Sequence, residues 1–308
     1  MLNKSKYTSE AVLIIVTLLW GATFVIVKDA IQEISPLLFI TIRFVIAGII
    51  LFPFMLKKSF DKKSVLSGIL LGVLLFLGFA LQTVGLKYTA ATKSGFLTGT
   101  AVILVPVLQF LIEKRPPKKG VIIGAIVVML GVTFLSSGGS SVLTLLSDFG
   151  TNFNFGDGLT LLCAIFFALY IIYIDMETTK YDFGILLFLQ IVTVAFLGII
   201  FSFLFNQIGI EEIKISISNK SLFAVFYTSV FATLITTALQ TKYQKNVTPA
   251  KAGIIFAFEP LFAAIFAFFL LDEKLSNFGY IGAALIILGL IISELWESIF
   301  TRQSIGKN

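Results

Sequence analysis

The chain has 308 residues, of which 57% are hydrophobic and 13% are charged, and its mean hydropathy is +1.01. A soluble domain needs more polar residues than this to cover its surface, so the composition excludes a soluble globular protein. The formal net charge of +6 does not indicate a nucleic-acid ligand, because most basic residues lie in connections between hydrophobic segments.

Ten hydrophobic segments follow one another along the chain, each long enough to cross the ~30 Å hydrocarbon core of a bilayer as a helix. The first follows Lys4 and Lys6 but runs into Trp20-Gly21-Ala22 without a cleavage site, so we interpret it as a retained helix and not a signal peptide. The sequence therefore predicts an all-α integral membrane protein with helices at about 11–29, 36–56, 65–86, 92–112, 120–136, 157–175, 184–205, 221–241, 250–271 and 276–296.

The basic residues predict the orientation of these helices. With the N-terminus in the cytoplasm, sixteen Lys and Arg residues fall on the inner side and six on the outer side, while Arg43 lies within a helix. The positive-inside rule then places both termini in the cytoplasm. Residues 136–155 contain no Lys or Arg, which suits an external segment, and they separate the two halves of the chain.

The two halves are related by a repeat of five segments. The offset is 147 residues in the earlier part and 158 in the later part, because the second half has extra residues around 206–220. Five is an odd number, so the second copy must cross the bilayer in the opposite direction, which is the inverted-repeat architecture of secondary transporters. The matched positions are 80–83 with 238–241 (ALQT in both), Lys93 with Lys251, Gly95 with Gly253, Trp20 with Phe167, Lys28 with Asp175 and Arg43 with Gln190.

Several short motifs occur in a fixed order on this doubled unit. They are Leu19-Trp20-Gly21 with Phe24, Arg43-Phe44, 95–99 (GFLTG) followed by Val105-Pro106, 259–263 (EPLFA) closing on 272–275 (DEKL), and a glycine-rich run at 279–289. Together they resemble the drug/metabolite transporter superfamily, EamA type, over nearly the full chain.

The resemblance implies a ten-helix carrier in the cell membrane, with a central cavity between two repeats that works by alternating access. Its substrate would be a small metabolite, commonly an amino acid or a toxic organic compound, and often exported. The implied division is a first EamA-like repeat at 1–140, an external linker at 141–155, a second repeat at 156–296 and a cytoplasmic tail at 297–308.

Glu259 is the first candidate site residue. It lies about nine residues into the ninth segment, roughly 13 Å deep at 1.5 Å per residue. An ionised carboxylate there costs about 2.5–3.5 kcal/mol, so Glu259 is a candidate proton carrier or cation-binding group. A structural acid held by a neighbouring hydroxyl or amide is the alternative. Pro106 and Pro260 are candidate hinges, because proline removes a backbone hydrogen bond and permits a kink.

Arg43 is the only arginine within a segment, and it could bind a substrate carboxylate, pair with an acid or extend toward the outer interface. Gln82 and Gln240, each followed by a threonine, are candidate gate or cavity groups near opposite mouths. The alternative is interhelical hydrogen bonding worth ~0.6 kcal/mol each. Thr98, a further candidate substrate-binding residue, lies beside Gly95-x-x-x-Gly99, a spacing that mostly serves close helix packing.

Trp20 and Thr23 correspond through the repeat to Phe167 and Tyr170, and Tyr173 follows one turn later. Aromatic side chains with a polar tip suit a cavity for amino acids or flat organic compounds, so Trp20, Thr23, Tyr170 and Tyr173 are candidate substrate-binding residues. Such residues also serve as anchors at the membrane interface.

These features predict a secondary transporter that exports small metabolites such as amino acids, using a proton gradient or the gradient of the substrate itself. An efflux carrier for lipophilic drugs or cations is the alternative, and a lipid-modifying membrane enzyme is a remote one. The enzyme is disfavoured because the sequence has no histidine and its acids are scattered among the loops, apart from Glu259. No cofactor or metal is expected, the partners are the substrate, the lipid bilayer and protons, and a monomer is the default.

Overall fold

The computed structural model describes residues 4–56, 58–114, 116–137, 153–271 and 276–300. Within these ranges the chain is helical and has no strand, apart from a single antiparallel bridge between Ile34 and Ile215. Ten helical segments are long and apolar enough to cross a membrane, as the sequence predicted. The predicted linker at 141–155 and the motif at 272–275 fall mostly or entirely outside the described residues.

Six of the ten spans are single helices. They are α3 (Pro36–Met55), α4 (Lys62–Tyr88), α7 (Lys119–Ser136), α9 (Phe155–Thr178), α10 (Phe183–Gln207) and α15 (Asn277–Phe300).

The other four spans are interrupted. The first comprises α1 (Lys4–Gly21) and α2 (Thr23–Glu33), the fourth α5 (Ala91–Gly99) and α6 (Ala101–Glu113), and the ninth α13 (Pro249–Phe256) and α14 (Glu259–Leu271). The eighth comprises α11 (Asn219–Ser229), the π-helical turn η1 (Val230–Ile235), α12 (Thr236–Tyr243) and the 3₁₀ turn η2 (Gln244–Asn246). Broken helices and π turns are typical of membrane segments that line a cavity.

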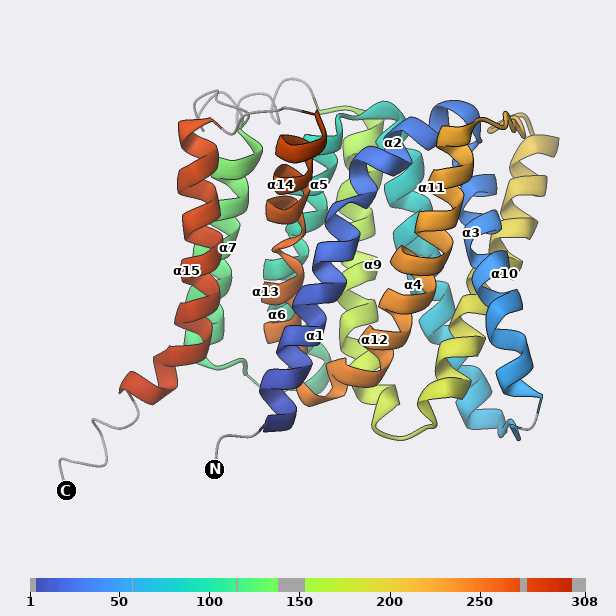
Figure 1. The fold of residues 1–308 in the computed structure, drawn as a ribbon. Helices are drawn as coiled ribbons and strands as arrows, with labels where there is room; N and C mark the ends of the chain where they lie inside the picture. The colour runs from blue at the N-terminus through green and yellow to red at the C-terminus, as the bar shows by residue number, and fades with distance from the viewer. Residues whose placement is uncertain (1–3, 57, 115, 138–152, 272–275, 301–308) are drawn as a thin grey trace.

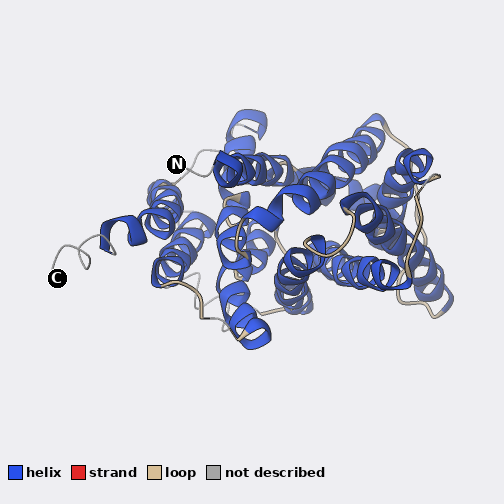
Figure 2. Cartoon of the chain, turned by 90° about the horizontal axis from the view of Figure 1, so that it is seen from below, coloured by secondary structure: helices blue, strands red, loops and turns tan. Residues whose placement is uncertain are grey.

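The spans run alternately up and down the helical body (Figure 1). The described ends of α1 and α15, at Lys4 and Phe300, lie at the same end, which we call the lower end. Seen along the helices, the body has an elongated cross-section (Figure 2). In Figure 1, α7 and α15 form one edge, and α3 and α10 lie toward the other.

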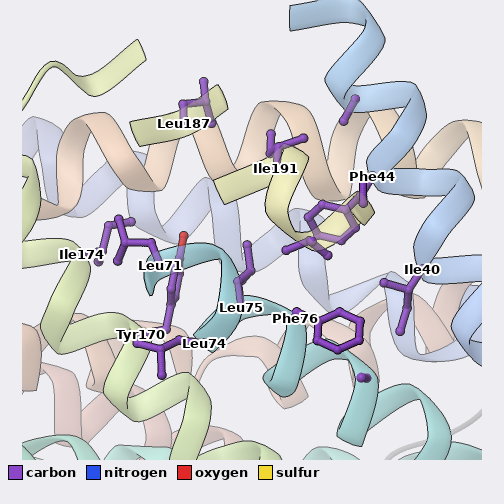
Figure 3. Close-up of a cluster of buried hydrophobic side chains, with 14 of the residues drawn as sticks. Ile40, Phe44, Leu71, Leu74, Leu75, Phe76, Tyr170, Ile174, Leu187 and Ile191 are labelled. Atoms are coloured by element: carbon purple, nitrogen blue, oxygen red, sulfur yellow. The ribbon is translucent and has the colours of Figure 1, made fainter. Parts of the chain in front are cut away.

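Buried side chains pack the helices on both sides of the centre. One cluster joins α3, α4, α9 and α10, and Figure 3 shows Tyr170 of α9 beside Leu71 and Leu74 of α4. A second cluster joins α5–α7 with α13–α15 and includes Val128 and Ile254.

Glycines let several helix pairs approach closely. A Cβ on Gly124 of α7 would lie 2.6 Å from the carbonyl oxygen of Gly289 in α15, and a Cβ on Gly72 of α4 would lie 2.4 Å from Cβ of Thr193 in α10. The spacing Gly68-x-x-x-Gly72 therefore serves packing against α10, as expected for small residues at this spacing.

Polar side chains in the connections cap the helices. Asp61 accepts hydrogen bonds from the backbone N–H groups of Lys63 and Ser64 at the start of α4, and the hydrogen bonds from Ser64 lower the pKa of Asp61. Asp182 caps α10 by accepting from Ile185 N–H, and its hydrogen bond with Lys58 is the main reason that its pKa lies below the usual range.

The connection after α10 packs on the start of α3. Glu211 is buried there and accepts a hydrogen bond from the backbone N–H of Leu37 at 3.1 Å. Burial raises the pKa of this carboxyl above its ordinary value of 4.5. The connection is further held by the backbone hydrogen bond from Ser35 N–H to the Lys214 carbonyl oxygen.

Candidate functional site

A cavity lies in the middle of the body, beside the breaks in the first, fourth and ninth spans. The space that the centre of a water-sized sphere can occupy in it is about 80 Å³. One water molecule needs only ~10–15 Å³ on this measure, so the cavity holds several waters or a small solute. Its polar lining residues are Trp20, Thr23, Arg43, Gln82, Thr98, Tyr170, Gln240 and Glu259, and its aromatic ones include Phe24, Phe79, Phe167 and Phe256.

Glu259 brings a carboxylate to this cavity at the break in the ninth span. It is the first residue of α14 and follows the turn at Ala257 and Phe258. Its side chain is half-buried and lines the cavity, and no hydrogen bond or ion pair to its carboxylate occurs within the described part of the chain. This carboxylate is therefore available to a solute or a proton.

Gly21 allows α1 to pass directly against the residues around Glu259. A Cβ at this position would lie 2.6 Å from Cβ of Phe262 and 3.1 Å from the carbonyl oxygen of Glu259. Any larger residue would push α1 away from α14, so glycine is required here for close approach.

Arg43 brings a positive charge to the same cavity from α3. Only 2% of it is exposed, and its guanidinium Nε donates a hydrogen bond to Thr233 Oγ1 at 2.8 Å. The guanidinium carbon also lies 4.5 Å from the ring centroid of Phe79, close enough for a cation–π interaction. Arg43 therefore does not extend to the membrane interface, which was one of its sequence-based interpretations.

The π-helical turn in the eighth span provides a shared acceptor for two cavity residues. The carbonyl oxygen of Ala232 accepts hydrogen bonds from Arg43 Nη2 at 3.1 Å and from Trp20 Nε1 at 3.3 Å. Trp20 Nε1 also lies 3.2 Å from Thr236 Oγ1. The turn thus fixes the orientation of both side chains toward the cavity.

The two repeat-related glutamines line one cavity and not two separate mouths. Gln82 Nε2 donates to Thr98 Oγ1 at 3.2 Å, while Gln240 Nε2 donates to Gln244 Oε1 at 2.8 Å. Each threonine that follows a glutamine is buried, and Thr241 Oγ1 accepts a hydrogen bond from Gln190.

Tyr170 is held by a buried polar chain. Its hydroxyl donates to Gln190 Oε1 at 2.7 Å, and Gln190 Nε2 donates to Thr241 Oγ1 at 2.9 Å. Gln190 is the repeat counterpart of Arg43, and like Arg43 it bonds to the eighth span. Satisfied buried networks of this kind fix one arrangement of the side chains.

Both halves of the chain match one known family of membrane proteins. The EamA-like transporter family matches residues 8–137 and again 154–295. The chain belongs to the EamA-like transporter family.

Several similar proteins are also named as transporters. An "uncharacterized transporter" of Archaeoglobus fulgidus is 34% identical over 92% of this chain and 84% of that protein. YoaV of Bacillus subtilis, also named an uncharacterized transporter, is 23% identical over 95% and 98% of the two chains. The "uncharacterized inner membrane transporter YedA" of Escherichia coli K12 is 21% identical over 94% and 91%. A crystal structure with 15% identity superposes with a TM-score of 0.75 over 94% of this chain and 98% of its own.

The protein is therefore a multi-pass transporter of the plasma membrane, and its substrate is a small molecule. No group of three or more acidic or cysteine side chains that could hold a metal ion occurs among the residues described. The resemblance to the drug/metabolite transporter superfamily, EamA type, is confirmed.

Two of the predicted site residues lie away from the transporter's cavity. Tyr173 packs against the cluster that joins α3, α4, α9 and α10 instead of lining the cavity. A separation of three residues turns a helix by about 300°, so Tyr173 and Tyr170 differ in direction by about 60°. Pro106 lies inside α6, whereas the fourth span breaks at Thr100, six residues earlier. Pro260, in contrast, is the second residue of α14, just after the break in the ninth span, and lines the cavity.

Sequence reasoning missed the phenylalanines of the transporter's cavity. Phe79 lies under the Arg43 guanidinium and contacts Phe167 edge-on, with ring centroids 5.4 Å apart. With 33 phenylalanines in the chain, composition alone does not distinguish these residues. The repeat, which pairs Phe167 with the candidate site residue Trp20, was the only feature of the sequence that could have placed Phe167 at the cavity.

Proposed function

We propose that this transporter exports a small zwitterionic metabolite, such as an amino acid, by alternating access through the central cavity. The observation that carries the proposal is that Glu259 and Arg43 present opposite charges to one cavity. A zwitterion has an ammonium group for the carboxylate and a carboxylate for the guanidinium. Arg43 has five N–H donors and its hydrogen bonds to Thr233 and Ala232 use only some of them, so donors remain for a substrate.

Proton coupling through Glu259 is part of this proposal. An acid in a cavity at membrane depth can move a proton between the two sides if the cavity opens to each in turn. The absence of a protein partner for its carboxylate among the residues described supports this role.

Two inverted five-helix repeats, at 1–140 and 156–296, form the proposed moving parts. The two separate family matches, at 8–137 and 154–295, support this division. Equivalent spans also run in opposite directions in Figure 1. We further propose that the lower end faces the cytoplasm, since that orientation gives sixteen inner and six outer basic residues.

Efflux of lipophilic drugs or cations is the second candidate function. The aromatic lining formed by Trp20, Phe79, Phe167 and Phe256 favours flat apolar compounds, and Glu259 would bind their positive charge. In this case Arg43 would serve only to hold the second and eighth spans together.

Counterflow uptake into proteoliposomes tests the proposal. Purified protein is reconstituted with a mixture of unlabelled amino acids inside, and uptake of single labelled amino acids, organic cations and drugs is followed with and without an imposed proton gradient. We expect saturable uptake of one amino-acid class that responds to the gradient. Uptake of organic cations alone would favour the second candidate, and uptake of neither would contradict both.

A further inference from the structure

One ion pair ties the two halves of the chain together at the upper end. Lys93, in the first turn of α5, lies 2.6 Å from the carboxylate of Asp157, in the first turn of α9. Asp157 is fully buried and also accepts a hydrogen bond from Thr89 Oγ1 at 2.5 Å. The contact joins the end of the third span and the start of the fourth to the start of the sixth.

A second ion pair ties the halves together at the lower end. Lys251, in the first turn of α13, lies 2.5 Å from the carboxylate of Glu10 in α1. The exposed fractions of the two side chains are 6% and 13%, so this pair is also largely buried. Lys251 contacts Glu294 of α15 as well, and Lys6 lies 3.2 Å from Glu294.

The two ion pairs are equivalent under the repeat. Lys93 and Lys251 differ by the offset of 158, and Glu10 and Asp157 differ by the offset of 147, which are the offsets of the later and earlier parts of the repeat. In each pair the lysine comes from one half and the acid from the other. The upper pair joins Lys93 of the first half to the second, and the lower pair joins Lys251 of the second half to the first.

We propose that these pairs are the two gates of the transporter, Lys93–Asp157 on the outer side and Glu10–Lys251 on the inner side. The inference rests on the alternating access and orientation given under Proposed function. Both lysines begin helices whose next turns line the cavity, at Gly95 and Thr98 in α5 and at Gly253 and Phe256 in α13. Separation of either pair would therefore open the cavity to that end, while the other pair keeps the opposite end closed.

Each ion pair can exist in two states, formed or separated, as a gate requires. A buried charge without its partner is costly, so the two groups stay paired while the protein covers them. In the open state both groups are exposed to water, which solvates them. A movement that separates one pair at a time never leaves the cavity open to both sides. Both pairs are formed together in this structure, as expected of an occluded state.

The gates are testable without knowing the substrate, by following labelling of a cysteine in the cavity. Cys163 is the only native cysteine, so Cys163→Ser with Thr23→Cys gives a parent with one reporter in the cavity lining. A membrane-impermeant maleimide is applied to intact cells for the outer face and to inverted vesicles for the inner face. Neutral double variants remove each pair without leaving one buried charge unpaired.

We expect Lys93→Gln with Asp157→Asn to raise the labelling rate from the outer face about tenfold and to lower it from the inner face. Glu10→Gln with Lys251→Gln should do the reverse. The matched control is Lys58→Gln with Asp182→Asn, which removes a 2.9 Å ion pair whose side chains are 42% and 44% exposed. This control should leave labelling from both faces unchanged.

Folding is checked by thermal stability and gel filtration in detergent. If the outer double variant does not fold, Lys93→Gln alone takes its place, since Asp157 then keeps its hydrogen bonds with Thr89 and Asn154. Changes in the same direction for both pairs, or no change beyond that of the control, would overturn the gate assignment while alternating access stands. A reporter that no variant exposes to either face would overturn alternating access together with the gates.

Discussion

The guanidinium Nε of Arg43 donates a hydrogen bond to Thr233 Oγ1 at 2.8 Å, which joins α3 to the π-helical turn of the eighth span. The charge of Arg43 is thus oriented by the protein before any substrate binds. Preorganised donors of this kind bind a charged group without the cost of reordering the side chain.

Removing the charge of Arg43 is expected to weaken substrate binding. In Arg43→Gln, which places the residue of the second repeat in the first, we expect KM to rise by about tenfold or more, because a hydrogen bond to a charged group is worth ~1.5–3 kcal/mol. Thr233→Val is the matched variant, because it removes the hydrogen bond to Nε and keeps the charge. Its KM should change by less than about threefold. Equal effects of the two variants on KM in counterflow uptake would assign Arg43 a purely structural role.

Glu259→Gln is expected to uncouple transport from protons. Glutamine has nearly the same shape but carries no titratable proton, so uptake driven by an imposed proton gradient should fall about a hundredfold. Counterflow exchange should continue with a raised KM, because the substrate ammonium loses its carboxylate partner. The control is Glu177→Gln, which alters a carboxylate already bonded to Ser67 and Lys180 at the end of α9. If gradient-driven uptake persists in Glu259→Gln, another group carries the proton.

Gly21→Ala is expected to destabilise the protein. The new Cβ would lie 2.6 Å from Cβ of Phe262 and 2.9 Å from the backbone nitrogen of Ala263, and such overpacking costs about 1–3 kcal/mol. Gly48→Ala is the control, because its Cβ would meet no atom closer than 3.7 Å. Thermal unfolding in detergent should show a Tm lower by several degrees for Gly21→Ala alone, and equal Tm values would contradict the packing argument.

Glu211 gives the stability of the protein a predictable pH dependence. Burial raises the pKa of this carboxyl above its ordinary value of 4.5. At a pH above the raised pKa, the ionised carboxylate lowers the free energy of unfolding. This loss of stability shrinks as the pH falls through the raised pKa and is gone below 4.5. Glu211→Gln removes the charge and can still accept the hydrogen bond from Leu37. We expect its Tm to exceed that of the unaltered protein by about 2 °C at pH 7 and to equal it at pH 4. A lower Tm at pH 7 would mean that the charge stabilises the connection.

Much of the fold could be predicted from the sequence, because hydrophobic length is a strong signal for membrane helices. The break at Thr100 could not, since a one-residue turn between two apolar helices leaves the hydropathy unchanged. The pairing of Lys93 with Asp157 depends on which helices are neighbours, and hydropathy carries no such information. The position of Tyr173 could not be predicted either. Tyr170 and Tyr173 share one side of α9, but only the residues that point directly at the cavity line it.

The breaks at Ala22, Thr100 and Ala257–Phe258 bring six helix ends to the cavity region: those of α1, α2, α5, α6, α13 and α14. Each helix end carries roughly half an elementary charge from its aligned peptide dipoles, positive where a helix starts and negative where it ends. At each break the negative end of one helix therefore meets the positive start of the next, so the backbone presents partial charges of both signs beside the cavity, and no side-chain substitution removes them. Variants that neutralise Arg43 or Glu259 will consequently leave backbone groups of both signs beside the cavity.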